Sequence, residues 1–198
     1  MALRLKIEID EIEPKIWREL IVPENLGLDT LHWIILGAIG WNGSHLHAFE
    51  IKNKRYIQWP SQDDLKDMPG WMKPEDDELD ESQHTIGTLV RARQKFKYHY
   101  DFGDDWFHTV TVIERTKSVP HSDWPVCVGG ERAGPPDDCG GPFGYMEILD
   151  ALQHSRHPDH AEIKAYYGDL EPEIFSVRQA NSLISALITL HEERVSRD

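Results

Sequence analysis

The sequence predicts a single α+β domain, in which a mostly antiparallel sheet comes first along the chain and helices come last. Alternating apolar and polar residues recur between positions 2 and 114, whereas apolar residues at helical spacing dominate positions 143 to 194. Strands and helices do not alternate regularly, so a parallel sheet is not indicated. We expect one early helix and a C-terminal helical group to pack on one face of the sheet, in one domain over residues 1–198.

The first elements are predicted to be a β-hairpin and a helix. Residues 2–10 alternate apolar and polar side chains, and residues 16–22 form a second short strand-like stretch. Asp29 or Thr30 is then expected to cap a helix whose apolar face covers the sheet and which ends at Gly40.

Two further strand pairs follow, and the second is the clearest hairpin in the chain. Alternation returns over residues 45–51, and residues 56–59 offer a short partner strand. Residues 95–102 and 106–114 are strongly strand-like and are separated by Gly103–Asp105.

The register of this hairpin is predicted from its apolar face. A three-residue loop pairs Phe102 with Trp106, Tyr100 with His108, Tyr98 with Val110 and Phe96 with Val112. A two-residue loop would instead place Asp101 opposite Trp106 and would bury less apolar area. The preferred register puts His108 on the inner face, so we expect that side chain to have low exposure.

Two segments are predicted to lie outside regular elements. Residues 61–81 hold nine Asp or Glu against two Lys, half of the net charge of −14, and are expected to form an exposed acidic excursion. Residues 118–142 contain five Gly and five Pro and are expected to form a long loop.

The last third of the chain is predicted to be helical. Apolar spacing indicates a helix over residues 143–154, and Pro158 suits the first position of another helix that runs to about Tyr167. Ser176 and Gln179 form a capping box at the start of the final helix.

Composition argues against several classes of function. A net charge of −14 would repel a phosphate backbone, so nonspecific nucleic-acid binding is not expected. No apolar run approaches the roughly 20 residues that span a bilayer. Cys127 and Cys139 are too sparse for a secreted disulfide framework, which favours a reducing compartment. We therefore expect a cytoplasmic protein without a membrane segment, and the sequence leaves its oligomeric state open.

Four segments of the chain resemble the signature of the plasmid Ri ORF-three-like family, small bacterial and archaeal proteins sometimes encoded near mobile elements. The segments are Pro14–Arg18, Gly40–Trp41 with His45–Phe49, Tyr100–His108, and Cys127–Gly141 with Gly144–Tyr145. Their order and spacing cover most of the chain. The resemblance implies an α+β fold and, for some relatives, a label as a transposon-associated resolvase-like passenger, but it implies no established activity.

Residue types suited to a divalent metal gather around the predicted turn and loops. Imidazole and carboxylate groups suit Zn, Mn or Fe, and the chain offers them at His45, His47, Asp101, Asp104, Asp105, His108, Asp137 and Asp138. The chain has no HExxH, no paired CxxC, and no nucleotide or flavin motif. The sequence therefore identifies no cofactor, and a divalent metal is the one candidate that it leaves open. The binding candidates are His47, Tyr100, Asp101, Asp104, Trp106, His108, Asp137, Asp138 and Cys139.

Two functions remain open from the sequence. The leading interpretation is a non-catalytic binding or adaptor module, which recognises a protein or a small-molecule ligand at the hairpin turn and the 118–142 loop. The resemblance adds an association with mobile genetic elements. The alternative is a metal-assisted hydrolase or nuclease-like enzyme that uses His47, Asp101, Asp104, His108 and Asp138.

Overall fold

The computed structural model describes residues 1–70, 73–117 and 125–196, and its centre is one eight-stranded sheet. The strands are β1 (Ala2–Ile9), β2 (Trp17–Pro23), β3 (His47–Ile51), β4 (Lys54–Ile57), β5 (Glu78–Asp80), β6 (Lys95–Tyr100), β7 (Trp106–Thr116) and β8 (Val126–Glu131). They follow the order β5-β4-β3-β6-β7-β1-β2-β8. Neighbouring strands run antiparallel, except for the parallel pair β4 and β5. The predicted α+β class is confirmed.

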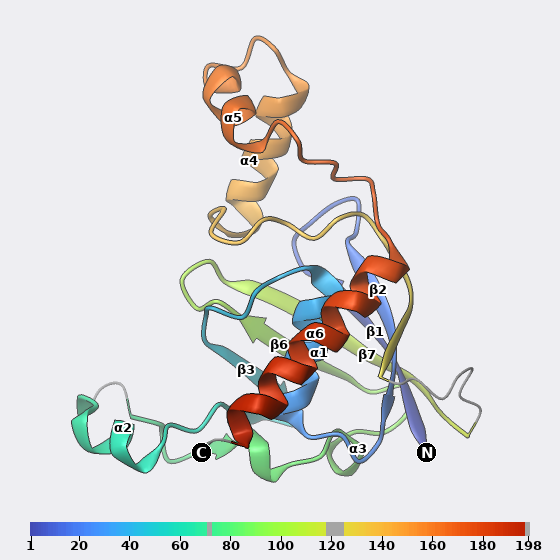
Figure 1. The fold of residues 1–198 in the computed structure, drawn as a ribbon, viewed down its shortest axis with the longest axis vertical. Helices are drawn as coiled ribbons and strands as arrows, with labels where there is room; N and C mark the ends of the chain where they lie inside the picture. The colour runs from blue at the N-terminus through green and yellow to red at the C-terminus, as the bar shows by residue number, and fades with distance from the viewer. Residues whose placement is uncertain (71–72, 118–124, 197–198) are drawn as a thin grey trace.

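Helices lie on and around this sheet (Figure 1). They are α1 (Leu28–Ile39), α2 (Gln62–Asp67), α3 (Ile86–Leu89), α4 (Gly141–Gln153), α5 (His160–Tyr167) and α6 (Val177–Val195), with the short 3-10 helix η2 (Glu81–Gln83). Helix α1 lies on the sheet and α6 packs across α1, whereas α4 and α5 extend beyond the end of the sheet (Figure 1).

None of the helices in the described ranges combines the length and the apolar character that crossing a membrane requires.

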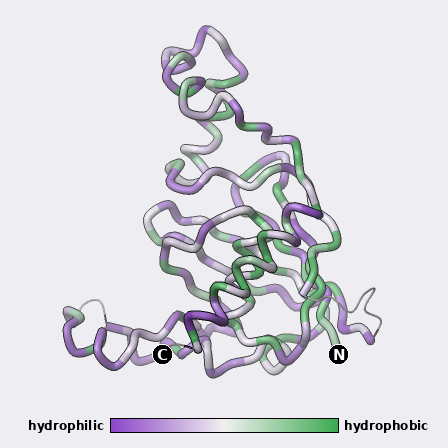
Figure 2. The backbone as a smooth tube through the Cα atoms, in the orientation of Figure 1, coloured by the Kyte–Doolittle hydropathy of each residue, from purple (hydrophilic) through white to green (hydrophobic). Residues whose placement is uncertain are grey.

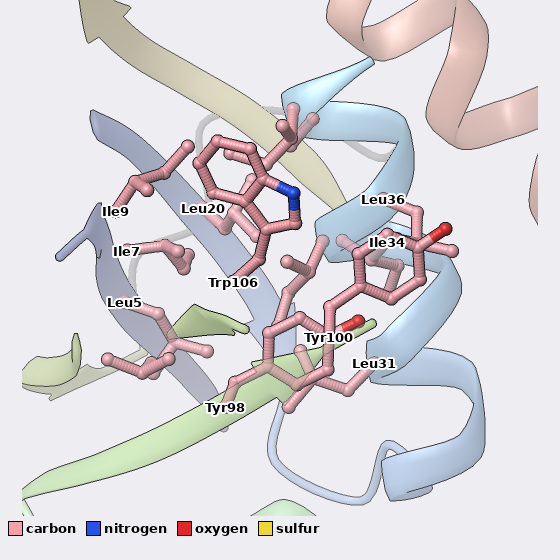
Figure 3. Packing of buried hydrophobic residues seen from close by; sticks show 14 of the residues in the cluster. Leu5, Ile7, Ile9, Leu20, Leu31, Ile34, Leu36, Tyr98, Tyr100 and Trp106 are labelled. Carbon is pink, nitrogen blue, oxygen red and sulfur yellow. The ribbon is translucent and has the colours of Figure 1, made fainter. Parts of the chain in front are cut away.

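The core lies between the sheet and α1. Side chains from β1, β6 and β7 meet the apolar side of α1 there, and Leu5, Ile7, Leu31 and Trp106 are fully buried (Figure 3). Burying one such side chain stabilises the fold by about 1.5–3 kcal/mol. Figure 2 shows part of this division along the backbone, because the excursion around α2 is mostly hydrophilic, α1 is mostly apolar, and the central strands mix hydrophilic and apolar residues.

The predicted hairpin register is wrong by two residues. Tyr100 pairs with Trp106, and Tyr98 pairs with His108. The loop is longer than predicted because Asp101 and Asp105 both adopt left-handed backbone conformations, with φ of 54° and 56°. A shift of two keeps each side chain on its face, so the expected burial of His108 is confirmed at 0% exposure.

The predicted acidic excursion contains more structure than the charge pattern indicated. Residues 61–70 are mostly exposed, as expected, although they include α2 with a capping box from Ser61 and Asp64. The end of the segment was predicted wrongly, because β5 joins the sheet and Glu81 is buried at 3% exposure. Residues 71 and 72 lie outside the described ranges.

The predicted long loop over 118–142 is also corrected, because β8 forms within it and pairs with β2 at the edge of the sheet. Its glycines permit this position. A side chain at Gly130 would lie 2.6 Å from the Phe175 ring and 2.8 Å from the Trp17 carbonyl oxygen. Residues 118–124 lie outside the described ranges, and residues 132–140 form the remaining loop.

Helix boundaries differ from the predictions by a few residues. Gly27, and not Asp29 or Thr30, is the N-cap of α1, while α4 starts at Gly141 and α5 at His160. The Ser176 side chain accepts a hydrogen bond from the backbone N–H of Gln179, which is one of the two bonds of the predicted capping box.

Helices α1 and α6 cross at Gly37, where the backbones approach closely. A Cβ atom at this position would lie 2.6 Å from the backbone nitrogen of Ile184 and 2.7 Å from its Cα. Contacts this short force the two helices apart, so glycine is required at the crossing.

We expect Gly37→Ala to lower the free energy of unfolding by about 1–3 kcal/mol, because overpacking at the crossing outweighs the roughly 1 kcal/mol that alanine contributes to helix propensity. Urea denaturation measures the change. Gly70→Ala is the control, since no atom of the described residues lies within 4 Å of a Cβ there. A Gly37→Ala variant that is more stable than the wild type would contradict the close packing of α6 on α1.

Candidate functional site

The turn between β6 and β7 meets the loop that precedes α4. The backbone N–H of Gly140 donates to Oδ2 of Asp104 at 2.9 Å. Gly141 has a left-handed φ of 69°, and a side chain there would collide with the Asp104 carbonyl oxygen. The two segments that the sequence nominated for binding are therefore in direct contact.

A third segment, the connection between α1 and β3, brings His45 to this junction. One ligand atom from each of His45, Asp101 and Asp138 lies within 4.8 Å of the others. Nδ1 of His45 is 3.4 Å from Oδ2 of Asp101, and Nε2 is 3.2 Å from Oδ1 of Asp138. These three residues are called the cation cluster below.

The two carboxylate oxygens of Asp101 have different contacts: one accepts hydrogen bonds within the turn, and the other faces His45 in the cation cluster. Its Oδ1 accepts hydrogen bonds from the backbone N–H groups of Gly103 and Asp104, at 3.0 and 3.3 Å. Its carbonyl oxygen also accepts from the N–H of Asp105 at 2.7 Å. This turn chemistry leaves Oδ2 directed at His45. A carboxylate held in this way is preorganised for a ligand.

Asp137 adds negative charge next to the cluster and ties two loops together. Its Oδ2 accepts from the backbone N–H of Asn42 at 3.3 Å. Burial raises the pKa of Asp137; the Asn42 N–H and His45 oppose this rise, whereas the charges of Asp138 and Asp101 add to it. Carboxylates that disfavour each other's ionisation attract a cation.

An aromatic wall supports the cluster from inside. Trp41 stacks on Tyr100 with ring centroids 4.9 Å apart, and its Nε1 donates to the Pro135 carbonyl oxygen at 2.9 Å. The Tyr100 ring meets His45 edge-on at 5.7 Å. Burial, and next the charge of Asp137, raise the pKa of Tyr100 to about 12. The phenol therefore stays protonated at neutral pH.

Cys139 is placed beside the carboxylates as a protonated thiol. Burial, and next the charge of Asp104, raise the pKa of Cys139 to about 12. Because the thiolate is the reactive form, this environment disfavours a nucleophilic role. Cys127 lies on β8, where burial also raises its pKa, and both cysteines are free.

Other predicted site residues lie elsewhere. Trp106 and His108 belong to the core, where His108 Nδ1 is 3.3 Å from the Tyr98 carbonyl oxygen. Nε2 of His47 is 2.7 Å from Oε2 of Glu81. The metal set of the enzyme hypothesis, which relied on His47 and His108, is therefore not assembled as predicted.

His45 is the residue that sequence reasoning did not choose as a binding candidate. It lies outside β3, which begins at His47, and it follows the Asn42-Gly43 turn, in which Asn42 Oδ1 accepts from the Ser44 N–H at 2.9 Å and Gly43 has a φ of 81°. That turn signal was visible in the sequence and could have favoured His45. One imidazole with two carboxylates suits Zn, Mn or Fe, and three protein ligands leave further coordination positions open to an external group.

Comparison with known proteins places this architecture among proteins without an assigned activity. The chain is 31% identical over 190 residues to the uncharacterized protein y4hQ of Sinorhizobium fredii, covering 94% of this chain and 92% of the relative. It also resembles the crystal structure of a protein of unknown function, MM3350 from Methanosarcina mazei, with a TM-score of 0.72, 29% identity, and coverage of 89% of this chain and 96% of that one.

The family comparison covers the segments that build the cation cluster. The family model described as plasmid pRiA4b ORF-3-like protein matches residues 1–179, which include His45, Asp101 and Asp138, the aromatic wall and Cys139. The chain belongs to the plasmid pRiA4b ORF-3-like family.

Proposed function

We propose that this protein is a non-catalytic binding module. Its ligand-binding site contains a divalent cation that is held by His45, Asp101 and Asp138. The observation that carries the proposal is the convergence of their ligand atoms within 4.8 Å, from three segments far apart in the sequence. The external ligand is a protein or small-molecule group, such as a carboxylate, that completes the coordination of the cation. The reducing cytoplasm suits a chain whose two cysteines are free.

Charge and solvent access support this proposal. The Asp138 side chain is 75% exposed, while that of Asp101 is 11% exposed. The cluster therefore combines an anchored inner ligand with an outer one that a partner can reach. A net charge of −14 favours a cationic bridge and disfavours nonspecific nucleic-acid binding. A specific role near mobile genetic elements would then act through a protein partner.

We expect Asp101→Asn to weaken the binding of Mn²⁺ or Zn²⁺ roughly tenfold or more, because a neutral amide replaces the charged inner ligand. Asparagine tolerates the left-handed backbone and its Oδ1 keeps the turn bonds. Equilibrium dialysis with elemental analysis, on protein purified without an affinity tag, measures the affinity.

Asp105→Asn is the matched control, because Asp105 lies in the same turn but is paired with His99, at 2.9 Å, outside the cluster. Its affinity for the ion should equal that of the wild type. A wild type that binds neither ion, or equal loss in both variants, would refute the cation cluster.

The second candidate function is metal-assisted hydrolysis. Three protein ligands with open positions are also the arrangement of catalytic zinc sites, where the metal activates a water molecule. Incubation of the Zn²⁺- or Mn²⁺-loaded protein with phosphoester, ester and peptide substrates separates the two functions. Turnover that is lost in Asp101→Asn would replace the binding module with an enzyme.

A further inference from the structure

A cavity of about 470 Å³ lies apart from the cation cluster, between α1, the β4–α2 connection, η2 and the end of α6. His32, His47 and Glu81 form part of its lining, and each is only 3% exposed. We propose that this cavity binds a small organic cation that carries N–H donors, such as an amine or an amidinium.

The pair of His47 and Glu81 indicates that the ligand is a hydrogen-bond donor. Nε2 of His47 is 2.7 Å from Oε2 of Glu81, and an ionised carboxylate only accepts, so Nε2 carries the proton. When the His47 ring is neutral, Nδ1 is then an acceptor. Nδ1 is buried and has no hydrogen-bond partner among the described residues. A buried acceptor without a partner costs about 1–3 kcal/mol, and a ligand N–H would remove that cost.

His32 holds the imidazole of His47 in place. The two rings stack with centroids 3.5 Å apart and an interplanar angle of 7°. Nδ1 of His32 is 2.8 Å from the Tyr98 hydroxyl oxygen. Burial lowers the pKa of His32 well below its usual range. This ring is thus neutral at pH 7 and adds no positive charge beside Glu81.

Fixed charges around the cavity also favour a cation. Asp29, Asp80 and Glu81 line it, against Arg194 as the single arginine of the lining. Asp29 accepts from Nε2 of His191 at 3.1 Å, and Asp80 accepts from Ser82. Glu81 is the most deeply buried of the three, which makes it the main anchor for a ligand charge.

The Trp33 and Trp59 rings in the lining of the cavity indicate that a planar cation fits. Arg194 places its guanidinium over the Trp33 ring, 5.5 Å from the centroid, so this wall already accepts a planar cation from the chain itself. Trp59, also part of the lining and 38% exposed, offers a second ring near the entrance. A flat amidinium group would stack on these aromatic rings. Its N–H groups would donate to the acceptors of Glu81 and His47.

Benzamidine is the probe, with the neutral benzamide as its isostere. We expect benzamidine to bind the full chain and to shift the indole N–H signals of Trp33 and Trp59 in nitrogen-15 NMR spectra. Benzamide should bind roughly tenfold more weakly or not at all, and Glu81→Gln should weaken benzamidine by a similar factor. Equal affinity for the two compounds would refute the cationic specificity.

Trp59→Leu keeps the test valid should Glu81→Gln unfold, because Trp59 lies at the surface. It should weaken benzamidine severalfold through the loss of the cation–π contact. Addition of EDTA, or Asp101→Asn, should leave benzamidine binding unchanged, which separates this cavity from the cation cluster. Undisturbed indole signals at saturating benzamidine would overturn the inference.

Discussion

Replacement of Arg18 by alanine should lower the free energy of unfolding by about 3 kcal/mol or more. Arg18 is 1% exposed, and its guanidinium donates to three backbone carbonyl oxygens: Nε to Ala38 at 2.7 Å, and Nη1 to Trp17 and Glu131 at 2.7 and 2.9 Å. It also lies 3.9 Å from the Phe175 ring centroid. Truncation would leave a cavity and several unpaired buried acceptors. Urea denaturation at neutral pH measures the loss.

The loss of stability on replacing Arg18 depends on the planar shape of the guanidinium as well as on its charge. Burial lowers the pKa of Arg18 to about 10, so the side chain remains charged in the folded protein. Lysine lacks the planar fork, so Arg18→Lys should recover little of the stability. The control is Arg4→Ala, which removes an ion pair with Glu19 from a side chain that is 41% exposed, and should cost under about 1 kcal/mol. Equal effects of Arg18→Ala and Arg4→Ala would contradict a structural role for Arg18.

Alternation predicted the strands that have one face in the core, because burial of one face imposes a period of two. In β6, Phe96, Tyr98 and Tyr100 all point to the core, as the pattern requires. The register could not be obtained in this way. A shift of two residues preserves the pattern, and the choice is made by the left-handed backbones of Asp101 and Asp105.

Strand β8 could not be predicted, because its composition is typical of a loop. Gly129 and Gly130 lower strand propensity, yet a larger residue at 130 would meet Phe175 from the segment before α6. The contact that selects glycine here is tertiary. A tertiary contact also explains why the burial of Glu81 was not predicted. The acidic segment around Glu81 indicates exposure, but its partner His47 lies 34 residues earlier in the chain.

The sequence nominated some of the residues that meet at the candidate site. The hairpin turn and the loop before α4 were both nominated, because a run rich in Asp and a run rich in Pro and Gly mark turns that carry polar groups. Asp101 and Asp138 from these two segments do converge. The choice between His45 and His47 depended on which of them precedes β3. That boundary is fixed by the pairing of β3 with β6, a pairing that begins at His47, and the Asn42-Gly43 turn is the local signal that points to it.

Acidification should destabilise the protein through His108. Burial lowers the pKa of His108 from 6.5 to about 4, partly offset by the Tyr98 carbonyl. Between these two values the unfolded chain binds the proton that the folded protein excludes, so stability rises with pH in this window and is lost as the pH falls through it. We expect His108 to account for a loss of about 2 kcal/mol between pH 7 and pH 5.

Urea denaturation of the wild type and of His108→Gln at both pH values isolates this contribution, because acid effects of other groups are common to the two proteins. The wild type should lose about 2 kcal/mol more than the variant on acidification. His154→Gln is the control, since the His154 side chain is 63% exposed and should leave the wild-type slope unchanged. NMR titration supplies a second readout that does not depend on the variant folding: the His108 ring signals should stay constant until the pH approaches about 4. A midpoint near 6.5 would show that the imidazole reaches solvent, and it would contradict the register that buries His108 opposite Tyr98.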